Sequence, residues 1–566
     1  MKAVTGAIGR AWRRAGDWGL FAGCFLLSLL LYLQTLAPSV ATLLDDSLEF
    51  PLAAYLLAIA HPTGYPLYML LGKLFSLGPW SNVAWAVNLL SAVAGALTVA
   101  LSYLIGRELT RPRDGPAGRH WPALLGAAAL AVSPIFWSQA VIAEVYTLNS
   151  AFFAALIWLA LRWAREPLLP VEPFSLLLVP PRRERTLFLP GAGLWLRLPP
   201  GLRRAAHRLH AFYRRFFPPV PPKRRLHLHP RLYALVALFG LSLTHHRTIV
   251  LLAPALLVFA FLMERRVFSR AVLLGPEHPE RPRWRQIAGR PVVLLAACLL
   301  APLLLYLYLP LRGHIGSLDG LYSHTWSGFW QWVSGSIYSA FLGENPLARN
   351  LDAAFYARLF WEQFGPLGLA LALVGLIALL RRPRHLALTG LAFATYVAFA
   401  VVWQVPDVEV FFIPAFVLTA IWIGVGLDHA ADLLHIRGRS LAIRRLVAVS
   451  AVLVVLAAVV QPAVIAVRAY PDLDLSRRWI VHDYGQYILR EPLPGDSTIV
   501  GILGEMTLLR HFQRTAGFRP DIETVAANAE DARLAAIEEA LAQGRSVYAT
   551  RPLPGLTGRR SLGAVT

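Results

Sequence analysis

The chain has 566 residues, of which 56% are hydrophobic and only 15% are charged, and its formal net charge is +21. Soluble proteins usually carry about 25% charged residues, so this composition excludes a soluble multidomain enzyme. The two cysteines, Cys24 and Cys298, lie in apolar stretches, which excludes a disulfide scaffold and a cysteine-based zinc site.

Eleven apolar stretches are candidate membrane crossings, because a helix needs about 20 apolar residues to span a bilayer. In chain order they are Trp18–Leu36, Val83–Gly106, Trp121–Ala143, Val145–Leu161, Leu232–Thr244, Thr248–Met263, Pro291–Leu311, Phe364–Leu380, Leu386–Pro406, Val410–Leu427 and Leu446–Val467. The fifth and sixth are short, and we interpret them as a tight helical hairpin. The first is too long for a cleavable signal peptide and lacks a small-residue cleavage site after it.

The placement of basic residues predicts the orientation of these helices. With the N-terminus inside, the inner segments hold 37 of the 54 Lys and Arg residues, the outer loops hold five, and the tail after Val467 holds 12. This asymmetry follows the positive-inside rule. The basicity therefore reflects membrane topology, and we expect no nucleic-acid partner.

The largest inner segment, 162–231, is rich in Arg and Pro. The helical spacing of apolar and basic residues in 201–217 predicts a helix on the anionic inner leaflet. A disordered, solvated linker explains the segment equally well. We assign no chemistry to it and include it in a transmembrane domain that covers residues 1–468.

Residues 469–566 have the pattern of a small soluble α/β domain. The expected strands and helices alternate in the order Ser497–Leu503 (strand), Glu505–Thr515 (helix), Ile522–Ala526 (strand), Asp531–Gln543 (helix) and Ser546–Ala549 (strand). The tail has no Gly-rich phosphate-binding motif, so a nucleotide site is not expected. An odd number of crossings places this domain on the extracytoplasmic side.

Three carboxylates follow the first crossing at once, in Leu44-Asp45-Asp46-Ser47-Leu48-Glu49-Phe50. Asp46 alone could be the N-cap of a helix that starts near Ser47. A cap does not require three acids, however, and carboxylates held between apolar helices at a membrane surface are costly. We therefore predict that Asp45, Asp46 and Glu49 are catalytic.

A turn rich in proline follows, His61-Pro62-Thr63-Gly64-Tyr65-Pro66-Leu67-Tyr68. It predicts a rigid, non-helical corner that presents His61 and Tyr65 beside the acids, although a simple corner between two interfacial helices is the alternative. Glu144 and Tyr146, at the outer hinge between the third and fourth crossings, are further candidates for substrate binding; a solvated turn explains them nearly as well.

Other polar residues lie at outer helix ends, and we predict substrate-binding roles for His245, His246, Arg247, Arg312, Asp407 and Glu409. Arginine suits a phosphate group because its planar fork donates two hydrogen bonds and stays charged. Arg312 could equally be an interfacial residue whose charged end reaches the membrane surface. The two adjacent histidines point about 100° apart on a helix, which makes a metal site from this pair unfavourable.

Several segments together resemble the protein O-mannosyltransferase-like family of multispanning membrane proteins, which is similar in plan to the GT-C glycosyltransferases. The resemblance is densest from Asp45 to Gly106. It is carried by the acidic loop, the His61–Tyr68 turn and the later segments Ala143-Glu144-Val145-Tyr146, Gly240-Leu241-Ser242-Leu243-Thr244-His245-His246, Tyr308-Leu309-Pro310-Leu311-Arg312 and Asp407-Val408-Glu409-Val410-Phe411. Leu48 and Thr63 depart from the signature, which usually has a glycine and a proline there; neither change removes a functional group.

The resemblance implies a polytopic α-helical membrane protein with a GT-C-like fold of about 11 crossings. It further implies transfer of a sugar, mannose or another hexose, from a polyprenyl-phosphate donor to a protein or glycan hydroxyl on the outer face. In this hypothesis Asp46 is the general base of an inverting single displacement, and Arg312, together with Arg247, neutralises the departing phosphate. No metal cofactor is expected, although the three acids leave metal dependence open.

A transporter or flippase of lipid-linked sugars is the competing interpretation. A transporter should have polar residues near the middle of several spans, whereas here they gather at the outer ends. Only Asn88 and Asn149 lie deeper. A non-catalytic membrane scaffold is a third interpretation, but it leaves the acidic loop unexplained. High Arg usage and compact loops favour a bacterial plasma membrane.

Overall fold

A computed structural model describes most of the chain. The described residues are 2–43, 46–80, 82–110, 119–166, 168–170, 226–274, 282–341, 351–403, 405–433 and 441–553. The helix expected within 201–217 and the carboxylate of Asp45 lie outside the described residues.

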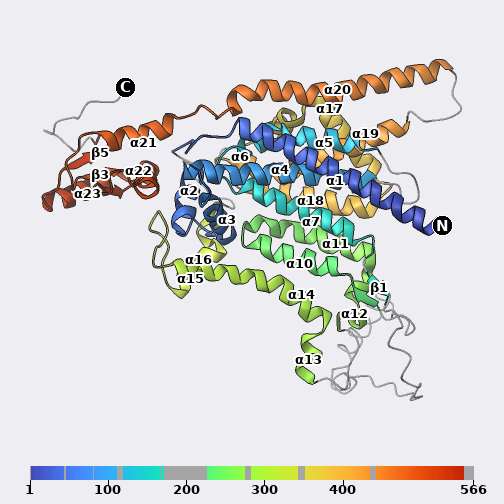
Figure 1. Ribbon diagram of the computed structural model, residues 1–566, viewed down its shortest axis with the longest axis horizontal. Coiled ribbons are helices and arrows are strands. Elements are labelled where there is room, and N and C mark those ends of the chain that lie inside the picture. Colours follow the sequence, from blue (N-terminus) through green and yellow to red (C-terminus); the bar gives the residue numbers. More distant parts are fainter. Residues whose placement is uncertain are drawn as a thin grey trace.

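Long apolar helices form the body of the molecule (Figure 1). Eight segments in the described ranges are long and apolar enough to cross a membrane: Gly16–Gln34 in α1 (Lys2–Gln34), α4 (Val83–Thr110), Arg247–Phe268, Pro291–Arg312, α17 (Ala353–Leu379), α18 (Pro383–Val402), Val408–Asp432, and Val452–Leu473 in α20 (Leu441–Leu473). The chain is therefore an integral, multi-pass membrane protein.

The other three expected crossings are helical but shorter or broken. The third is divided into α5 (Trp121–Ala131) and α6 (Pro134–Ala140), which meet at a bend of 68°. The fourth is α7 (Tyr146–Trp163), and the fifth is α10 (Pro230–Leu243), an apolar helix of 14 residues. Eight spans, or nine if the bent pair counts as one, are thus identified among the described residues, and the count of eleven stays a prediction.

Helices α4 and α19 (Ile413–Leu433) occupy the centre of the bundle. In the most apolar 18-residue stretch of each span, 83% and 94% of the residues are buried. Helices α1 and α20 lie at the periphery, with 17% and 6% buried. Small residues allow the central helices to approach closely. A side chain at Gly375 of α17 or Gly426 of α19 would collide with a carbonyl oxygen of the facing helix.

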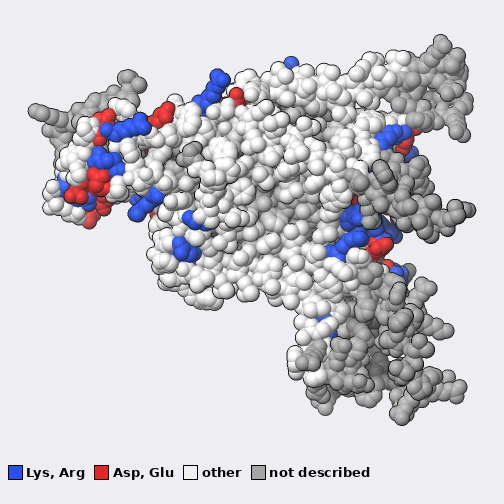
Figure 2. Space-filling model, viewed as in Figure 1, with Lys and Arg blue, Asp and Glu red and all other residues white. Residues whose placement is uncertain are grey.

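Charged residues are separated along the long axis of the molecule. On the face drawn in Figure 2, they gather at the two ends and leave a broad uncharged middle. The short helices α2 (Asp46–Leu56), α3 (Pro66–Ser76), α15 (Tyr308–Arg312) and α16 (Trp326–Ser334) lie at one of these ends, beside the C-terminal α/β elements (Figure 1). This end of the bundle therefore carries the acidic loop that the sequence singles out.

The tail forms the predicted alternation of strands and helices. Strands β3 (Thr498–Gly501), β4 (Glu523–Ala526) and β5 (Val547–Ala549) make a parallel sheet in the order β4-β3-β5. Helix α22 (Leu503–Ala516) connects β3 to β4, and α23 (Glu530–Ala542) connects β4 to β5. The preceding helix is α21 (Ile480–Arg490). Leu48 of α2 is buried in the same apolar cluster as Met506, Leu508 and Leu509 of α22. The α/β unit thus packs directly on the helix that carries the acids.

The remaining elements are short. They are β1 (Leu168–Pro170), paired antiparallel with β2 (Leu226–Leu228), and the helical segments η2 (Arg247–Leu252), α11 (Ala253–Glu264), η3 (Arg265–Phe268), α12 (Arg270–Leu274), α13 (Arg283–Ala288), α14 (Pro291–Leu300), η4 (Ala301–Leu307), η5 (Ser336–Phe341) and η6 (Val408–Phe412).

Candidate active site

Helix α2 places two of the predicted acids on one face. The helix begins at Asp46, and Glu49 follows three residues later, so that the two carboxylates lie one turn apart. Phe50, Ala53 and Ala54 are fully buried and fix the other side of the helix in the bundle. The Asp46 side chain is 44% exposed and that of Glu49 is 19% exposed. Asp46 is therefore the more accessible carboxylate.

The corner after α2 is non-helical, as predicted. Gly64 has a φ of +77°, and a Cβ there would come within 2.6 Å of the Leu309 side chain, so both backbone conformation and packing favour glycine. The Tyr308 hydroxyl donates to the Ala58 carbonyl (2.7 Å) and the Trp332 indole N–H to the Ala60 carbonyl (2.9 Å). These hydrogen bonds from distant helices hold the residues just before His61.

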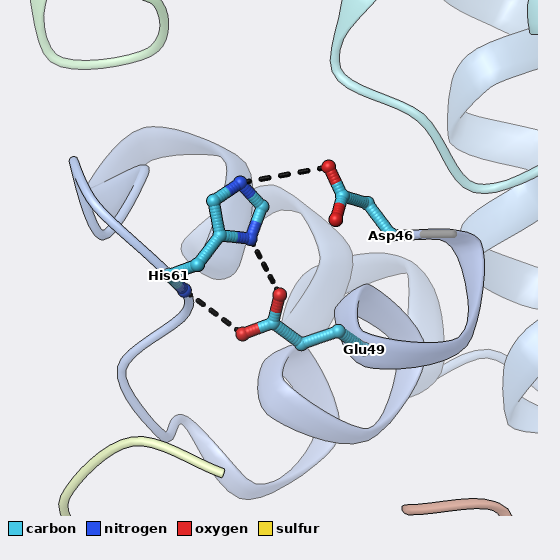
Figure 3. A group of neighbouring side chains, drawn as sticks. All are labelled: Asp46, Glu49 and His61. Atoms are coloured by element: carbon cyan, nitrogen blue, oxygen red, sulfur yellow. Dashed lines mark hydrogen bonds and ion pairs between the residues drawn. The ribbon is translucent and has the colours of Figure 1, made fainter. Parts of the chain in front are cut away.

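His61 bridges the two carboxylates (Figure 3). Its Nδ1 lies 2.5 Å from Glu49 Oε2, and its backbone N–H donates to Glu49 Oε1 at 2.8 Å. Its Nε2 lies 3.5 Å from Asp46 Oδ2 and 3.2 Å from the Tyr65 hydroxyl. Glu49 therefore orients the imidazole, and the ring presents its other nitrogen to Asp46 and Tyr65.

The neighbouring carboxylates determine the protonation state of His61. Burial opposes the imidazolium form, but Asp46 and Glu49, together with the more distant Asp319, outweigh it and raise the pKa of His61 to about 9. Burial and the Asp46 carboxylate raise the pKa of Tyr65 well above its usual value, so its hydroxyl stays neutral. At neutral pH the site thus holds one cation between two anions.

Aromatic rings connect this cluster to other predicted residues. Tyr65 lies 5.0 Å from the His61 ring and 5.9 Å from the His246 ring, and Tyr146 also lies 5.9 Å from the His246 ring. His245 is fully buried, stacks on Tyr68, and its Nε2 lies 2.9 Å from the Val145 carbonyl. His246 therefore lies at the site, whereas the contacts of His245 are structural.

Two of the remaining predicted acids, Asp407 and Glu144, act electrostatically on Tyr146. Its hydroxyl is within electrostatic range of Asp407, Glu144 and Asp46, which come from three separate parts of the chain. Glu144 is 4% exposed. Glu409 lies in η6, whose Phe411 contacts the Tyr146 ring at 5.7 Å. Residues that are hundreds of positions apart in the sequence thus surround one region.

The structure does not bring Arg312 to Asp46. The Arg312 guanidinium donates to the carbonyl oxygens of Leu57 (2.8 Å) and Leu56 (2.9 Å), at the C-terminal end of α2. Asp46 is at the opposite end of this 11-residue helix, about 15 Å away at 1.5 Å per residue. Arg312 therefore caps the carbonyl end of the helix that carries the acids, and its role in binding the donor phosphate stays a prediction.

Arg247 lies beside the site. It follows His246 directly, and a Cβ added at Gly335 would come within 2.6 Å of its Nη2, so the guanidinium lies over the start of η5. Tyr338 in η5 lies within electrostatic range of the site: burial and the carboxylates of Asp46 and Glu49 raise the pKa of its hydroxyl. Within the described part of the chain, Arg247 forms no ion pair with a carboxylate. Its charge is thus available beside the cluster.

Tyr338 and Asp319 were missed by sequence reasoning. Asp319 adds to the charge at His61, and its Oδ1 accepts a hydrogen bond from Ser317 (2.5 Å). Asp319 could have been found as a further acid in the loop between Arg312 and Trp326, which the predicted topology places on the outer side. No local pattern marks Tyr338.

The acid–histidine cluster could accommodate a cation. Asp46, Glu49 and His61 each offer one ligand atom, and these atoms lie within 4.8 Å of one another. Carboxylate and imidazole donors suit several divalent metals. In the structure the same atoms pair with one another, so the cluster is charge-compensated by His61.

Fold and site together define a multi-pass membrane protein with a carboxylate–histidine cluster at one end of its helix bundle. The same architecture occurs in ArnT from Cupriavidus metallidurans, whose crystal structure bound to undecaprenyl phosphate matches 94% of this chain and 90% of that chain with a TM-score of 0.50. The sequences are 14% identical, so this likeness establishes a shared fold. It confirms the GT-C-like plan expected from the sequence.

The segment that carries the site matches a known family. Residues 46–189 match the N-terminal domain of the protein O-mannosyl-transferase TMEM260. The chain is 30% identical over 154 residues to protein O-mannosyl-transferase tmem260 of Dictyostelium discoideum and 36% identical over 119 residues to mouse TMEM260. These matches cover 27% and 21% of this chain and 18% and 16% of the relatives, less than a fifth of their length. The resemblance that the sequence predicted is confirmed for this segment.

Proposed function

We propose that the protein is a membrane glycosyltransferase that moves a hexose, such as mannose, from a polyprenyl-phosphate donor to a hydroxyl acceptor on a protein or glycan. The observation that carries this proposal is the Asp46–His61–Glu49 cluster, which lies inside the segment that matches an O-mannosyl-transferase domain. An accessible carboxylate beside a cation suits deprotonation of a hydroxyl in the presence of an anionic donor.

The nature of the donor is inferred from the fold. The ArnT structure of the same architecture is bound to undecaprenyl phosphate. The apolar helices next to the site would let a lipid tail remain in the bilayer while its phosphate reaches Arg247. A lipid-linked sugar satisfies both environments at once, whereas a nucleotide sugar would use only the polar one.

In the proposed reaction, the acceptor oxygen attacks the anomeric carbon while the bond from that carbon to the lipid phosphate oxygen breaks. The acceptor proton passes to the Asp46 carboxylate, and polyprenyl phosphate leaves. Glu49 fixes the His61 ring, whose positive charge lies between the acids. Arg247 neutralises charge on the departing phosphate. This single displacement inverts the anomeric configuration.

The first test is transfer itself. Purified protein in lipid nanodiscs is incubated with a polyprenyl-phosphate hexose that is radiolabelled in the sugar, together with a Ser/Thr-rich peptide and a glycan acceptor. Loss of label from the lipid and its appearance on an acceptor, with inverted linkage by NMR, is expected. Movement of intact labelled lipid between leaflets without chemical change would instead indicate a transporter, and a retained linkage would exclude single displacement.

The membrane topology is part of the proposal. The positive-inside asymmetry favours a cytoplasmic N-terminus and an extracytoplasmic α/β unit, in a membrane that we propose to be the bacterial plasma membrane. A tag placed after the α/β unit should react with a membrane-impermeant reagent in intact cells. Reaction only after the cells are lysed would reverse the orientation.

Activity should decline at alkaline pH. Asp46 and Glu49 of α2, Asp319 of the outer loop and the Tyr65 hydroxyl face His61, whose pKa is about 9. Because this pKa is raised above the ordinary value of 6.5, the imidazolium is present at neutral pH and is lost as pH rises through about 9. Its loss leaves the carboxylates uncompensated and weakens binding of an anionic donor. We expect kcat/KM to fall above pH 9, by up to about tenfold per pH unit.

The measurement is a pH profile of donor consumption from pH 7 to 10.5. In His61→Gln, which cannot hold a proton, the alkaline decline should be absent and the rate low throughout. A decline of the same midpoint in that variant would assign it to another group.

Metal removal should leave the activity unchanged. The leaving group is a monophosphate, and His61 and Arg247 already supply positive charge, so we propose that no divalent cation is required. The test compares rates after dialysis against EDTA with rates after addition of Mg²⁺ or Mn²⁺. A loss that either ion restores would place a metal at Asp46, Glu49 and His61, whose ligand atoms are close enough to hold one.

A further inference from the structure

A small cavity lies beside the acid–histidine cluster. Six of its lining residues carry polar groups: Tyr146, Asn149, Ser150, His246, Thr248 and Tyr396. The Ser150 hydroxyl donates to the Tyr146 carbonyl (2.7 Å), and we refer to the other five residues as the polar cavity. The remaining walls are apolar and come from the ends of α18 and η6 and the start of α19. The space between these walls admits about one water-sized group.

A hydrogen-bond chain fixes the tautomer of His246. The backbone N–H of Thr248 can only donate, and it lies 3.3 Å from His246 Nδ1, so this nitrogen must accept. The Thr248 hydroxyl lies 2.7 Å from the same nitrogen and accepts from Asn149 Nδ2 at 3.2 Å. Burial, aided by nearby His245, Arg247 and His61, lowers the pKa of His246 to about 3. The ring is therefore neutral, and its proton is on Nε2.

Two polar atoms of this cavity lack a partner among the described residues. Asn149 is 4% exposed and Tyr396 is 1% exposed, and neither Asn149 Oδ1 nor the Tyr396 hydroxyl makes a hydrogen bond. Buried polar atoms are almost always satisfied, so an unpaired pair in one cavity indicates a missing polar group. The amide oxygen of Asn149 can only accept, and the Tyr396 hydroxyl can donate or accept.

These groups are the complement of a single hydroxyl. A hydroxyl donates one hydrogen bond and accepts up to two. Asn149 Oδ1 supplies the acceptor, and the Tyr396 hydroxyl and the N–H of His246 supply donors. An apolar group would leave all three unsatisfied, and a carboxylate would face the lone pairs of the Asn149 oxygen.

We propose that the polar cavity binds one hydroxyl group of the transferred sugar and so selects the sugar. The inference rests on the proposed glycosyl transfer. His246 and Tyr146 line the polar cavity, and His246 is connected to His61 through Tyr65, at 5.9 Å and 5.0 Å between rings. A hexose that lies across Tyr65, with its anomeric carbon near Asp46, would direct a distal hydroxyl toward Asn149 and Tyr396.

The test compares polyprenyl-phosphate hexose with a set of donors that each lack one ring hydroxyl. The wild-type protein should use one of these deoxy donors with a kcat/KM at least about tenfold below that of the parent donor, because the buried partners are then left unpaired. In Tyr396→Phe and in Asn149→Leu, the discrimination against this donor should fall to about threefold or less. Each ratio is measured within one variant, so it does not depend on the fraction of protein that is folded.

Tyr32→Phe is the matched control, because Tyr32 is also fully buried but donates to the Ala131 carbonyl (3.0 Å) within the bundle. It should keep the wild-type ratio. Wild-type protein that transfers the parent sugar but uses every deoxy donor equally well would overturn the sugar subsite and leave the polar cavity to a water molecule. Unchanged discrimination in Tyr396→Phe and Asn149→Leu would overturn it as well. Absence of transfer from the parent donor would instead defeat the proposed function on which the subsite rests.

Discussion

Asp46→Asn is expected to lower kcat by about 10²–10⁴-fold, the range that a positioned general base contributes. The amide keeps the size and shape of the carboxylate but cannot take the proton of the acceptor hydroxyl. Helix α2 should keep its position, because its buried face and the hydrogen bonds from Arg312 to its C-terminal carbonyls do not involve Asp46. The effect should appear in kcat more than in the KM for the donor.

Single-turnover rates with labelled donor provide the measurement. Asp483→Asn is the matched control, since Asp483 is an exposed acid on α21 whose side chain is 69% exposed. This control should retain the wild-type rate. If Asp46→Asn turns over at the wild-type rate, Asp46 is not the base, and the proton must pass to another group of the cluster.

Arg247→Ala should have the second largest effect, a decrease in kcat of about 10²–10³-fold, comparable to the loss of one preorganised oxyanion donor. The guanidinium lies over Gly335, next to the η5 segment. Tyr338 of this segment lies within electrostatic range of Asp46 and Glu49. It would stabilise charge that develops on the phosphate oxygen as the glycosidic bond breaks. Arg247→Lys should recover part of the loss, because it keeps the charge but loses the planar fork.

Arg358→Ala is the control for Arg247→Ala, because Arg358 is an exposed arginine of α17. Its removal should leave kcat unchanged. Arg312→Ala provides a second comparison, and its effect should act through the position of α2 and lower thermal stability as well. A wild-type kcat in Arg247→Ala, together with a large loss in Arg312→Ala at unchanged stability, would assign the phosphate role to Arg312.

Local patterns were sufficient for the elements that carry the site. Asp46 and Glu49 are three residues apart, which predicts one face of a helix. The prolines and the glycine between His61 and Pro66 predict a corner rather than a continuing helix. Both features are seen, because they depend on backbone preferences that neighbouring residues determine. The alternation of strands and helices after residue 496 is found within two residues of the expected limits for the same reason.

The contacts of the two arginines could not be predicted from local sequence patterns. Arg247 and Arg312 both follow apolar helices, and their sequence surroundings do not show which guanidinium contacts α2. In the tertiary structure, η4 and α15 place the Arg312 guanidinium at the carbonyl end of α2, which is the end opposite Asp46. The 3₁₀ segment η5 brings Gly335 under Arg247 and Tyr338 toward the acids.

The sequence by itself determined the membrane class, the approximate helices, the acidic loop and the family resemblance, because hydrophobic length, turn chemistry and short motifs are properties of contiguous residues. Only the tertiary structure decided that His61 bridges Asp46 and Glu49, that Arg312 supports α2, and that Asn149 and Tyr396 share one cavity. Asn149 and Tyr396 are 247 positions apart, on α7 and α18. Their meeting depends on how helices pack and rotate against one another, and side-chain direction across a helix interface is not encoded in any local period.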